Sequence, residues 1–198
     1  MLGSPKVALT ERQQARRDAL LDAGLRLLGT HSYEQIQVKD VADEAGVSLG
    51  TLYHYFASKE RLFAEVLVRW ADNLPVSIHR LPLRGTTAAD RLIDALQRAA
   101  RAFGRQPQMA RLVNTLVMSG DPYAAEIIAR LDRTTTGAYL EAMAPMPSEQ
   151  ALPVVEVVNA VFSTALREWS LGRVTLVALQ ERLVRAVYLL LPGPTFGG

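Results

Sequence analysis

Residues 38–56 read VKDVADEAGVSLGTLYHYF, and this stretch decides how the first part of the chain folds. Its apolar residues are spaced so that two short helices, at about 38–45 and 49–55, bury one face against each other. Gly46 lies between them, where a helix ends most easily on a left-handed glycine, and the Ser48 hydroxyl can cap the second helix. The stretch therefore predicts a helix-turn-helix. The residues expected to be buried in it are Val41, Ala42, Ala45, Val47, Leu52 and Phe56.

Burial of those residues leaves the other face of the second short helix outward. A helix of this size fits the major groove of DNA, which is about 12 Å wide. Thr51 offers a hydroxyl to base edges and a methyl to thymine, while Tyr53 and His54 can donate hydrogen bonds to phosphates. The residue chemistry also allows a small helical subdomain whose exposed Tyr and His merely cover its surface. The predicted DNA contacts are Lys39, Ser48, Leu49, Gly50, Thr51, Tyr53, His54 and Lys59.

Apolar periodicity predicts helices almost everywhere else. Thr10, followed by Gln13, is typical of a capping box that opens the first helix, and Ser58 can cap the fourth. No run alternates with period two for long enough to predict a sheet, so we expect an all-α fold of about nine helices. Pro153 is expected in the first turn of its helix, where proline is tolerated. The further helices are expected at about 10–30, 58–74, 88–104, 107–118, 122–143, 152–172 and 175–191.

These helices divide into two expected parts. Residues 10–74 form a DNA-binding domain, and residues 75–191 form a larger helical domain that begins with the Pro- and Gly-containing connector 75–87. The Gly- and Pro-rich tail, 192–198, is expected to fray.

Composition excludes several classes of protein. The chain has 198 residues, 49% hydrophobic and 21% charged, with no Cys. The apolar content excludes wholesale disorder, and the lack of Cys excludes disulfides, thiolate zinc sites and cysteine nucleophiles. No stretch approaches the roughly 18 apolar residues of a membrane span, and residues 10–26 are too charged for a signal peptide, so we expect a cytoplasmic protein. The net charge is only +2, so an argument for DNA rests on where charges lie.

The motif resembles the signature of the TetR family of transcriptional regulators. The run AGVSLGTLYHYFASKERLF, residues 45–63, is similar to the family pattern of a glycine turn, Ser, G-T-L-Y-x-Y-F and S-K-E before a long fourth helix. ALLDAGLRLLGTHSYEQIQVKDVA, residues 19–42, resembles its lead-in, and the resemblance covers about residues 12–70. By position it implies DNA contacts at Thr51, Tyr53, His54 and Lys59, with Ser48 and Lys39 beside them.

Two positions depart from the family pattern. Leu49 stands where members often have Lys, which removes a phosphate or base contact and offers an apolar one to a thymine methyl. Gln37 stands where Ser or Thr usually caps the second helix, and Gln is a poor cap. The steroid-catabolism (KstR-type) subgroup shares both features, and RAFGRQPQM at 101–109 is also similar to it. Members of that subgroup respond to steroid or acyl thioesters of coenzyme A.

The resemblance implies that the larger domain binds a small-molecule effector and that its last two helices form a homodimer. Segment 152–172 is apolar on nearly all sides, which favours burial against both its own core and a partner; central core helices are the alternative. The expected dimer residues are Val154, Val157, Val161, Leu179, Leu183, Val187 and Leu190.

Aromatic, Met and aliphatic residues at helical spacing in the larger domain are candidates to line an effector pocket, although such residues more often form plain core. Arg101, Arg105 and Arg111 could meet an anionic group of an effector, or simply form a solvated face. The candidate pocket residues are Phe103, Met109, Leu112, Leu116, Tyr123, Ile127, Phe162 and Trp169.

Nothing in the sequence indicates catalysis. His31, His54 and His79 lie in separate segments, no paired carboxylates suit acid–base chemistry, and there is no phosphate-binding loop. We therefore expect no enzyme activity, catalytic residue, metal or cofactor. The sequence predicts a homodimeric repressor that binds a near-palindromic operator and is released when an effector moves the helix at about 58–74. The rival prediction is a helical small-molecule or lipid-binding module without sequence-specific DNA binding.

Overall fold

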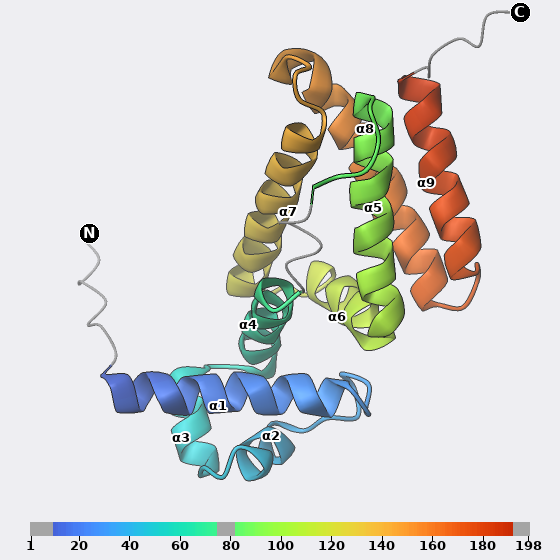
Figure 1. Cartoon of the computed structure of the whole chain (residues 1–198). Helices are drawn as coiled ribbons and strands as arrows, with labels where there is room; N and C mark the ends of the chain where they lie inside the picture. The colour runs from blue at the N-terminus through green and yellow to red at the C-terminus, as the bar shows by residue number, and fades with distance from the viewer. Residues whose placement is uncertain (1–9, 75–81, 192–198) are drawn as a thin grey trace, which may run out of the picture.

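The computed structural model describes residues 10–74 and 82–191, and every regular element in these ranges is a helix (Figure 1). The all-α, nine-helix prediction is confirmed for this part of the chain. The first half of the predicted connector, 75–81, and the tail, 192–198, lie outside the described residues. The helices are α1 (Glu11–Leu28), α2 (Val38–Glu44), α3 (Leu49–Tyr55), α4 (Lys59–Asp72), α5 (Ala88–Arg105), α6 (Pro107–Val117), α7 (Pro122–Ala142), α8 (Ser148–Ser170) and α9 (Leu176–Leu190).

Local hydrogen bonds explain where the first helices begin and end. The Thr10 Oγ1 accepts from the Gln13 N–H at 3.3 Å while the Gln13 side chain accepts from the Thr10 N–H at 2.9 Å, so the predicted capping box is present. Gly46 has φ +68°, the left-handed conformation expected between α2 and α3. At the start of α2 the Asp40 carboxylate accepts from the Gln37 N–H at 2.7 Å, which supplies a cap from the third helical residue.

The start of α8 was predicted wrongly. The helix begins at Ser148 rather than near residue 152, so Pro153 lies inside it and not in its first turn. The turn that follows Pro147 sets this start, because the Gln150 and Ala151 N–H groups both donate to the Pro147 carbonyl. A proline at this depth cannot donate to the carbonyl four residues earlier, so α8 forms despite one missing helical bond.

The helices on either side of residues 75–81 share a hydrophobic core. One buried cluster contains residues of α1 to α4 together with Met109, Leu112 and Leu116 of α6 and Ile127 of α7. A second cluster lies among α5, α7, α8 and α9. Figure 1 shows α4 standing between α1 and the larger group of helices. The described helices contain none that is both long and apolar enough to cross a lipid bilayer. α4 packs against α1 on one side and against α6 and α7 on the other, so it contacts both parts of the molecule.

Candidate nucleic-acid interface

The outer face of α3 is open to solvent at the end of the molecule farthest from α5 to α9 (Figure 1). Leu49 is 40% exposed and Tyr53 is 51% exposed, whereas Leu52 and Phe56 are buried beneath them. The predicted burial of the inner face is thereby confirmed for these two residues. We call the outer face of α3 the α3 tip; it comprises Leu49, Gly50, Thr51, Tyr53 and His54, of which all but the half-buried Thr51 are exposed.

A pair of hydroxyl groups holds the start of α3. The Ser48 Oγ accepts from the Thr51 N–H at 3.1 Å, which is the predicted N-cap, and lies 2.9 Å from the Thr51 Oγ1. A hydroxyl has one proton and two lone pairs, so the Thr51 group keeps bonding capacity for a base edge when it is paired with Ser48. The pairing fixes the direction of the Thr51 side chain before any DNA is bound.

Three glycines of the DNA-binding part have different surroundings, and these decide whether another residue could take their place. A Cβ at Gly24 would lie 2.8 Å from the Val66 Cγ2, so Gly24 allows α1 and α4 to approach closely. Gly46 is required by its positive φ. A Cβ at Gly50 would meet nothing nearer than the Ser48 Oγ at 3.9 Å. Glycine weakens a helix by up to about 1 kcal/mol relative to alanine, and no contact within the described chain requires glycine at position 50.

The two predicted lysines have different settings. Lys39 is exposed on α2. The Lys59 Nζ donates to the Tyr33 carbonyl at 2.6 Å and lies 4.2 Å from the centre of the Tyr33 ring. Desolvation lowers the pKa of Lys59, against the opposing effect of Glu34, Glu60 and Asp40. An ammonium has three donors, so this internal bond leaves Lys59 capacity for a phosphate. Sequence reasoning could not foresee the bond, because it joins the start of α4 to the turn between α1 and α2, 26 positions earlier.

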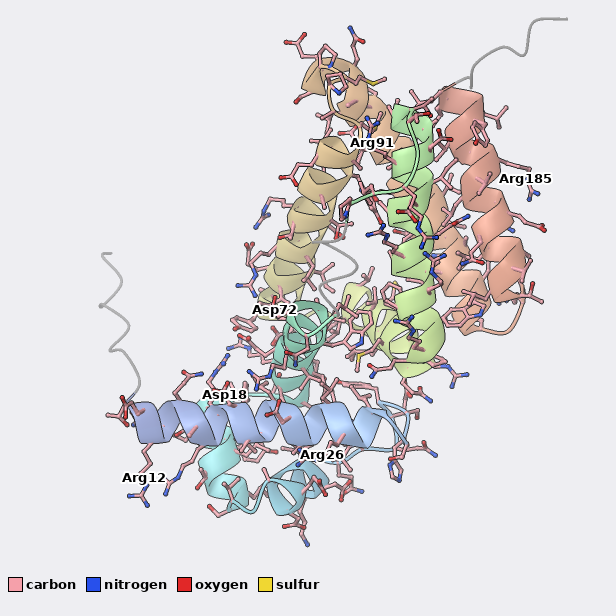
Figure 2. All side chains as sticks on the ribbon, viewed as in Figure 1. Arg12, Asp18, Arg26, Asp72, Arg91 and Arg185 are labelled. Carbon is pink, nitrogen blue, oxygen red and sulfur yellow. The ribbon has the colours of Figure 1, made fainter. Side chains whose placement is uncertain are left out.

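Arg12 is a cation that our predicted set of contacts left out. It is exposed at the start of α1, and Figure 2 shows its side chain extending from α1 on the side where α3 lies. The sequence signal was the cluster of arginines at the start of α1, but the helix pattern alone does not say which of them point toward α3. Arg17, in contrast, points inward and forms an ion pair with Glu65 at 3.0 Å.

The candidate pocket residues form packed core where α4 meets α5 to α8. Met109, Leu112, Leu116 and Ile127 are buried. The Phe103 ring lies 4.9 Å from Trp70 of α4 and 6.3 Å from Phe162 of α8, measured between ring centres. The remaining candidates are also part of this packing: Trp169 contacts the second cluster, and Tyr123 contacts the first.

An open groove of about 920 Å³ lies along α5, and its walls contain both charged and apolar side chains. Arg101 and Arg105, two of the arginines singled out in the sequence, line it together with Arg84 and Arg98. Asp90 and Asp94 also line the groove, and the Asp94 carboxylate accepts from Arg98 at 2.5 Å. The third predicted arginine, Arg111, lies elsewhere and donates to the Ser170 carbonyl of α8 at 3.3 Å. The groove therefore has an excess of guanidinium groups, which suits an anionic ligand.

The stripe predicted to form a dimer is partly internal. Leu179, Leu183 and Val187 are buried within the single chain, because they face α5 and α8, so a partner cannot reach them. Val154 and Val161 are half-buried, and Val157 and Leu190 are exposed. Exposed apolar side chains that the prediction omitted lie on the same two helices, and two of them, Val177 and Tyr188, line grooves beside α5. The omitted side chains are Leu152, Val177, Tyr188 and Leu189.

Within residues 10–74 and 82–191, no three His, Asp or Glu side chains lie close enough together to hold a metal ion. Three other features are candidates for binding. The α3 tip and the cations beside it could bind DNA, the arginine-lined groove on α5 could bind an anion, and the exposed apolar side chains of α8 and α9 could bind a second protein chain.

Two models of known protein families match this chain. Residues 20–66 match the family model for bacterial regulatory proteins of the tetR family, and residues 85–190 match the model for the tetracyclin repressor-like C-terminal domain. Together the two matches cover most of the chain.

Two curated relatives and one crystal structure resemble nearly the whole chain. HTH-type transcriptional repressor KstR of Mycobacterium tuberculosis (strain ATCC 25618 / H37Rv) is 30% identical over 183 residues, 92% of this chain and 83% of that protein. KstR of Rhodococcus jostii (strain RHA1) is 31% identical over 180 residues, 90% of this chain and 84% of that protein. A TetR transcriptional regulator from Rhodococcus sp. RHA1 superimposes with a TM-score of 0.77 and 26% identity, over 93% of this chain and 100% of that one. All three are regulators or repressors by name rather than enzymes.

Proposed function

The chain belongs to the TetR family of bacterial regulatory proteins, which are transcriptional regulators and not enzymes, and from this membership we propose that it is a ligand-responsive repressor. Two copies bind a near-palindromic operator in the cytoplasm, and each inserts its α3 tip into the major groove. The observation that carries the proposal is the exposure of Leu49 and Tyr53 on a helix whose opposite face is buried. The exposure of these two side chains, which have no internal role, is explained if DNA covers them, with base edges over Leu49 and a phosphate beside Tyr53.

Each residue of the tip has a role that follows from its chemistry. Thr51 contacts a base edge, and Leu49 contacts a thymine methyl. Tyr53 and His54 donate to phosphates on either side, as do Lys39 and Lys59. Arg12 adds a phosphate contact from the start of α1, because it extends on the same side as α3 (Figure 2). Gly50 lets the DNA backbone approach the helix closely.

Dimerisation sets the distance between the two tips. Exposed apolar residues of α8 and of the end of α9 form the proposed contact surface, namely Leu152, Val157, Leu189 and Leu190, with Val154 and Val161 at its edge. A symmetric dimer matches an operator whose half-sites lie about 34–36 Å apart, or somewhat more. The buried Leu179, Leu183 and Val187 support this surface from beneath.

The proposed effector is a small apolar or acyl-type molecule, and we propose a coenzyme A thioester as its form. Arg84, Arg101 and Arg105 in the α5 groove suit the phosphates of such a thioester. The acyl part would have to pass beside α5 to enter the packed residues around Phe103, because Phe103 is two residues from both Arg101 and Arg105 and faces the other side of that helix. Binding there separates α4 from α5 to α7 and changes the distance between the two tips, which releases one half-site.

A selection experiment tests the proposed function. The purified protein is used to enrich duplexes from a random pool, and the Kd for the enriched duplex is measured against a scrambled one at several salt concentrations. We expect a near-palindrome that binds at least about 10³-fold more tightly than the scrambled duplex and loses affinity steeply as salt rises. A pool that stays random, or equal Kd values for both duplexes, contradicts the proposal and favours a binding module without DNA recognition.

A further inference from the structure

Three charged residues of α4 lie in a single row. Arg61, Glu65 and Arg69 are four residues apart, so they share one face of the helix. We call them the α4 stripe. All three are half-buried, and each bonds to another helix. The stripe therefore joins α4 to its neighbours at three successive turns.

Arg69, at one end of the α4 stripe, bonds to α1. The Arg69 guanidinium bonds to both carboxylate oxygens of Asp22 on α1, at 2.9 and 3.1 Å, and to Asp18 at 3.4 Å. Figure 2 shows Asp18 on the side of α1 that faces α4. Two-point bonds of this kind fix orientation as well as distance. With the close approach at Gly24, they make α1 and α4 one rigid unit.

Arg61, at the other end of the α4 stripe, bonds to the larger domain. Its Nε lies 3.1 Å from the Asp121 Oδ2. The other Asp121 oxygen accepts from the Tyr123 and Ala124 N–H groups at 2.8 and 3.1 Å and so caps α7. The start of α7 and the start of α4 are therefore held by the same carboxylate.

Glu65, in the middle, bonds to both neighbours at once. Its Oε2 lies 3.0 Å from the Arg17 guanidinium of α1, and its Oε1 accepts from the Tyr123 hydroxyl of α7. Burial and the bond to Glu65 raise the pKa of Tyr123 to about 12, so the hydroxyl keeps the proton that it donates. Arg17 also lies 5.5 Å from the centre of the Phe56 ring, and Phe56 is the residue that ends α3.

We infer that Glu65 is a positioning residue that couples the start of α7 to the end of α3, through Tyr123 on one side and Arg17 on the other. This inference rests on the proposed function and adds to it the route by which the larger domain acts on the tip. A shift of α7 removes the Tyr123 bond, and the carboxylate is then held by Arg17 alone. Arg17 no longer has a fixed position over Phe56, and α3 loses a constraint on its orientation.

The test uses conservative variants of the full chain. Tyr123→Phe removes only the hydroxyl and leaves the ring that lies beside Arg61, and Glu65→Gln removes the charge but keeps the shape. Each variant is expected to bind the duplex enriched by the wild-type protein about two- to tenfold more weakly. The double variant is expected to bind no more weakly than Glu65→Gln alone, because Tyr123 acts through Glu65.

A matched control comes from another ion pair of α1. Arg26 bonds to Glu44 of α2 at 2.8 Å, and Figure 2 shows Arg26 on the side of α1 that faces α2. When Arg26→Gln is combined with Tyr123→Phe, the losses in duplex affinity should multiply. Multiplied losses in the Glu65→Gln, Tyr123→Phe double variant instead would overturn the inference. So would a Tyr123→Phe protein with a lower Tm but an unchanged Kd for the duplex, since that is a purely structural contact.

A second readout needs no DNA. The Phe56 N–H donates to the Leu52 carbonyl at 2.9 Å at the end of α3, and hydrogen exchange reports how often that bond opens. We expect exchange of the Phe56 amide to be faster in Tyr123→Phe and unchanged in Arg26→Gln. Equal exchange in all three proteins overturns the coupling even if the operator is confirmed. Faster exchange in a protein that selects no duplex would instead overturn the DNA-binding proposal and leave the coupling intact.

Discussion

The α3 tip and the candidate effector pocket contain similar kinds of residue in opposite settings. In the tip, Leu49 and Tyr53 are exposed and make no core. In the larger domain, Leu112 and Leu116 are buried and form the core around α4. An apolar side chain that its own chain leaves exposed indicates a binding partner, whereas a fully buried one is already accounted for by its role in the hydrophobic core. The comparison therefore supports the predicted DNA contacts more than it supports the predicted pocket lining.

The largest expected difference between the two regions is in stability. Leu112→Ala removes a fully buried side chain and should lower the free energy of unfolding by about 2–5 kcal/mol. Leu49→Ala, the same change at the tip, should alter it by no more than about 0.5 kcal/mol. Urea unfolding of both variants measures this. A small loss for Leu112→Ala would break the comparison, since it would mean that Leu112 borders a cavity after all.

The same division explains what could be predicted from the sequence. Thr10, Gly46 and Ser48 act on residues within four positions of themselves, so helix ends and the helix-turn-helix followed from local pattern. The start of α8 did not, because a proline at position 153 suits a first turn and only the turn after Pro147 moves the start earlier.

Contacts between distant residues could not be predicted at all. Arg61 and Asp121 are 60 positions apart, and Lys59 bonds to a carbonyl 26 positions earlier. The apolar stripe of α9 is compatible with burial inside the chain or against a partner, and only packing shows that Leu183 faces inward. Arg12 and Arg17 belong to one cluster in the sequence, and the fold turns one outward and the other inward.

The expected difference in DNA binding between a change at Thr51 of the α3 tip and a change at Lys39 of α2 is nearly as large in free energy. Thr51→Ala should cost about 1–3 kcal/mol of binding free energy at its cognate base pair and much less on a scrambled duplex. Lys39→Ala should weaken binding to both duplexes alike and reduce the dependence of affinity on salt. Competition binding with the enriched duplex and its single-base variants separates the two. Equal losses on both duplexes for Thr51→Ala would remove its assigned role in recognition of sequence.

Substitution of the helical glycines Gly24 and Gly50 by alanine is expected to change stability by a smaller amount and in opposite directions. Gly50→Ala should raise the free energy of unfolding by up to about 1 kcal/mol, because a Cβ there meets open space, while it weakens binding to the enriched duplex. Gly24→Ala should lower stability, since its Cβ would lie 2.8 Å from the Val66 Cγ2. Thermal unfolding and duplex binding of both variants check this. If Gly50→Ala bound DNA as tightly as the wild type, close approach of the DNA backbone would not be the reason for glycine.

The smallest expected effect is the pH dependence of stability at Asp121, which links the start of α4 to the start of α7. Desolvation alone would raise the pKa of Asp121, but bonds from the Ala124 N–H, the Arg61 guanidinium and the Tyr123 N–H outweigh it and lower the pKa below the ordinary 3.8. The stability that this charge contributes is therefore complete above pH 3.8 and is lost as the pH falls through the lower folded value.

Asp121→Asn tests that sign. The Tm of wild type should exceed that of Asp121→Asn by a constant amount above pH 3.8, and the gap should shrink at lower pH. Depressed pKa values at Asp90 and Asp94 act in the same range, but they are common to both proteins and cancel in the difference. Glu126→Gln is the control, because its pair with Arg133 on the same helix is mostly exposed and should contribute little. A gap that stayed constant to low pH would show that Asp121 stabilises the junction as a neutral cap of α7, and that its charge adds nothing through Arg61.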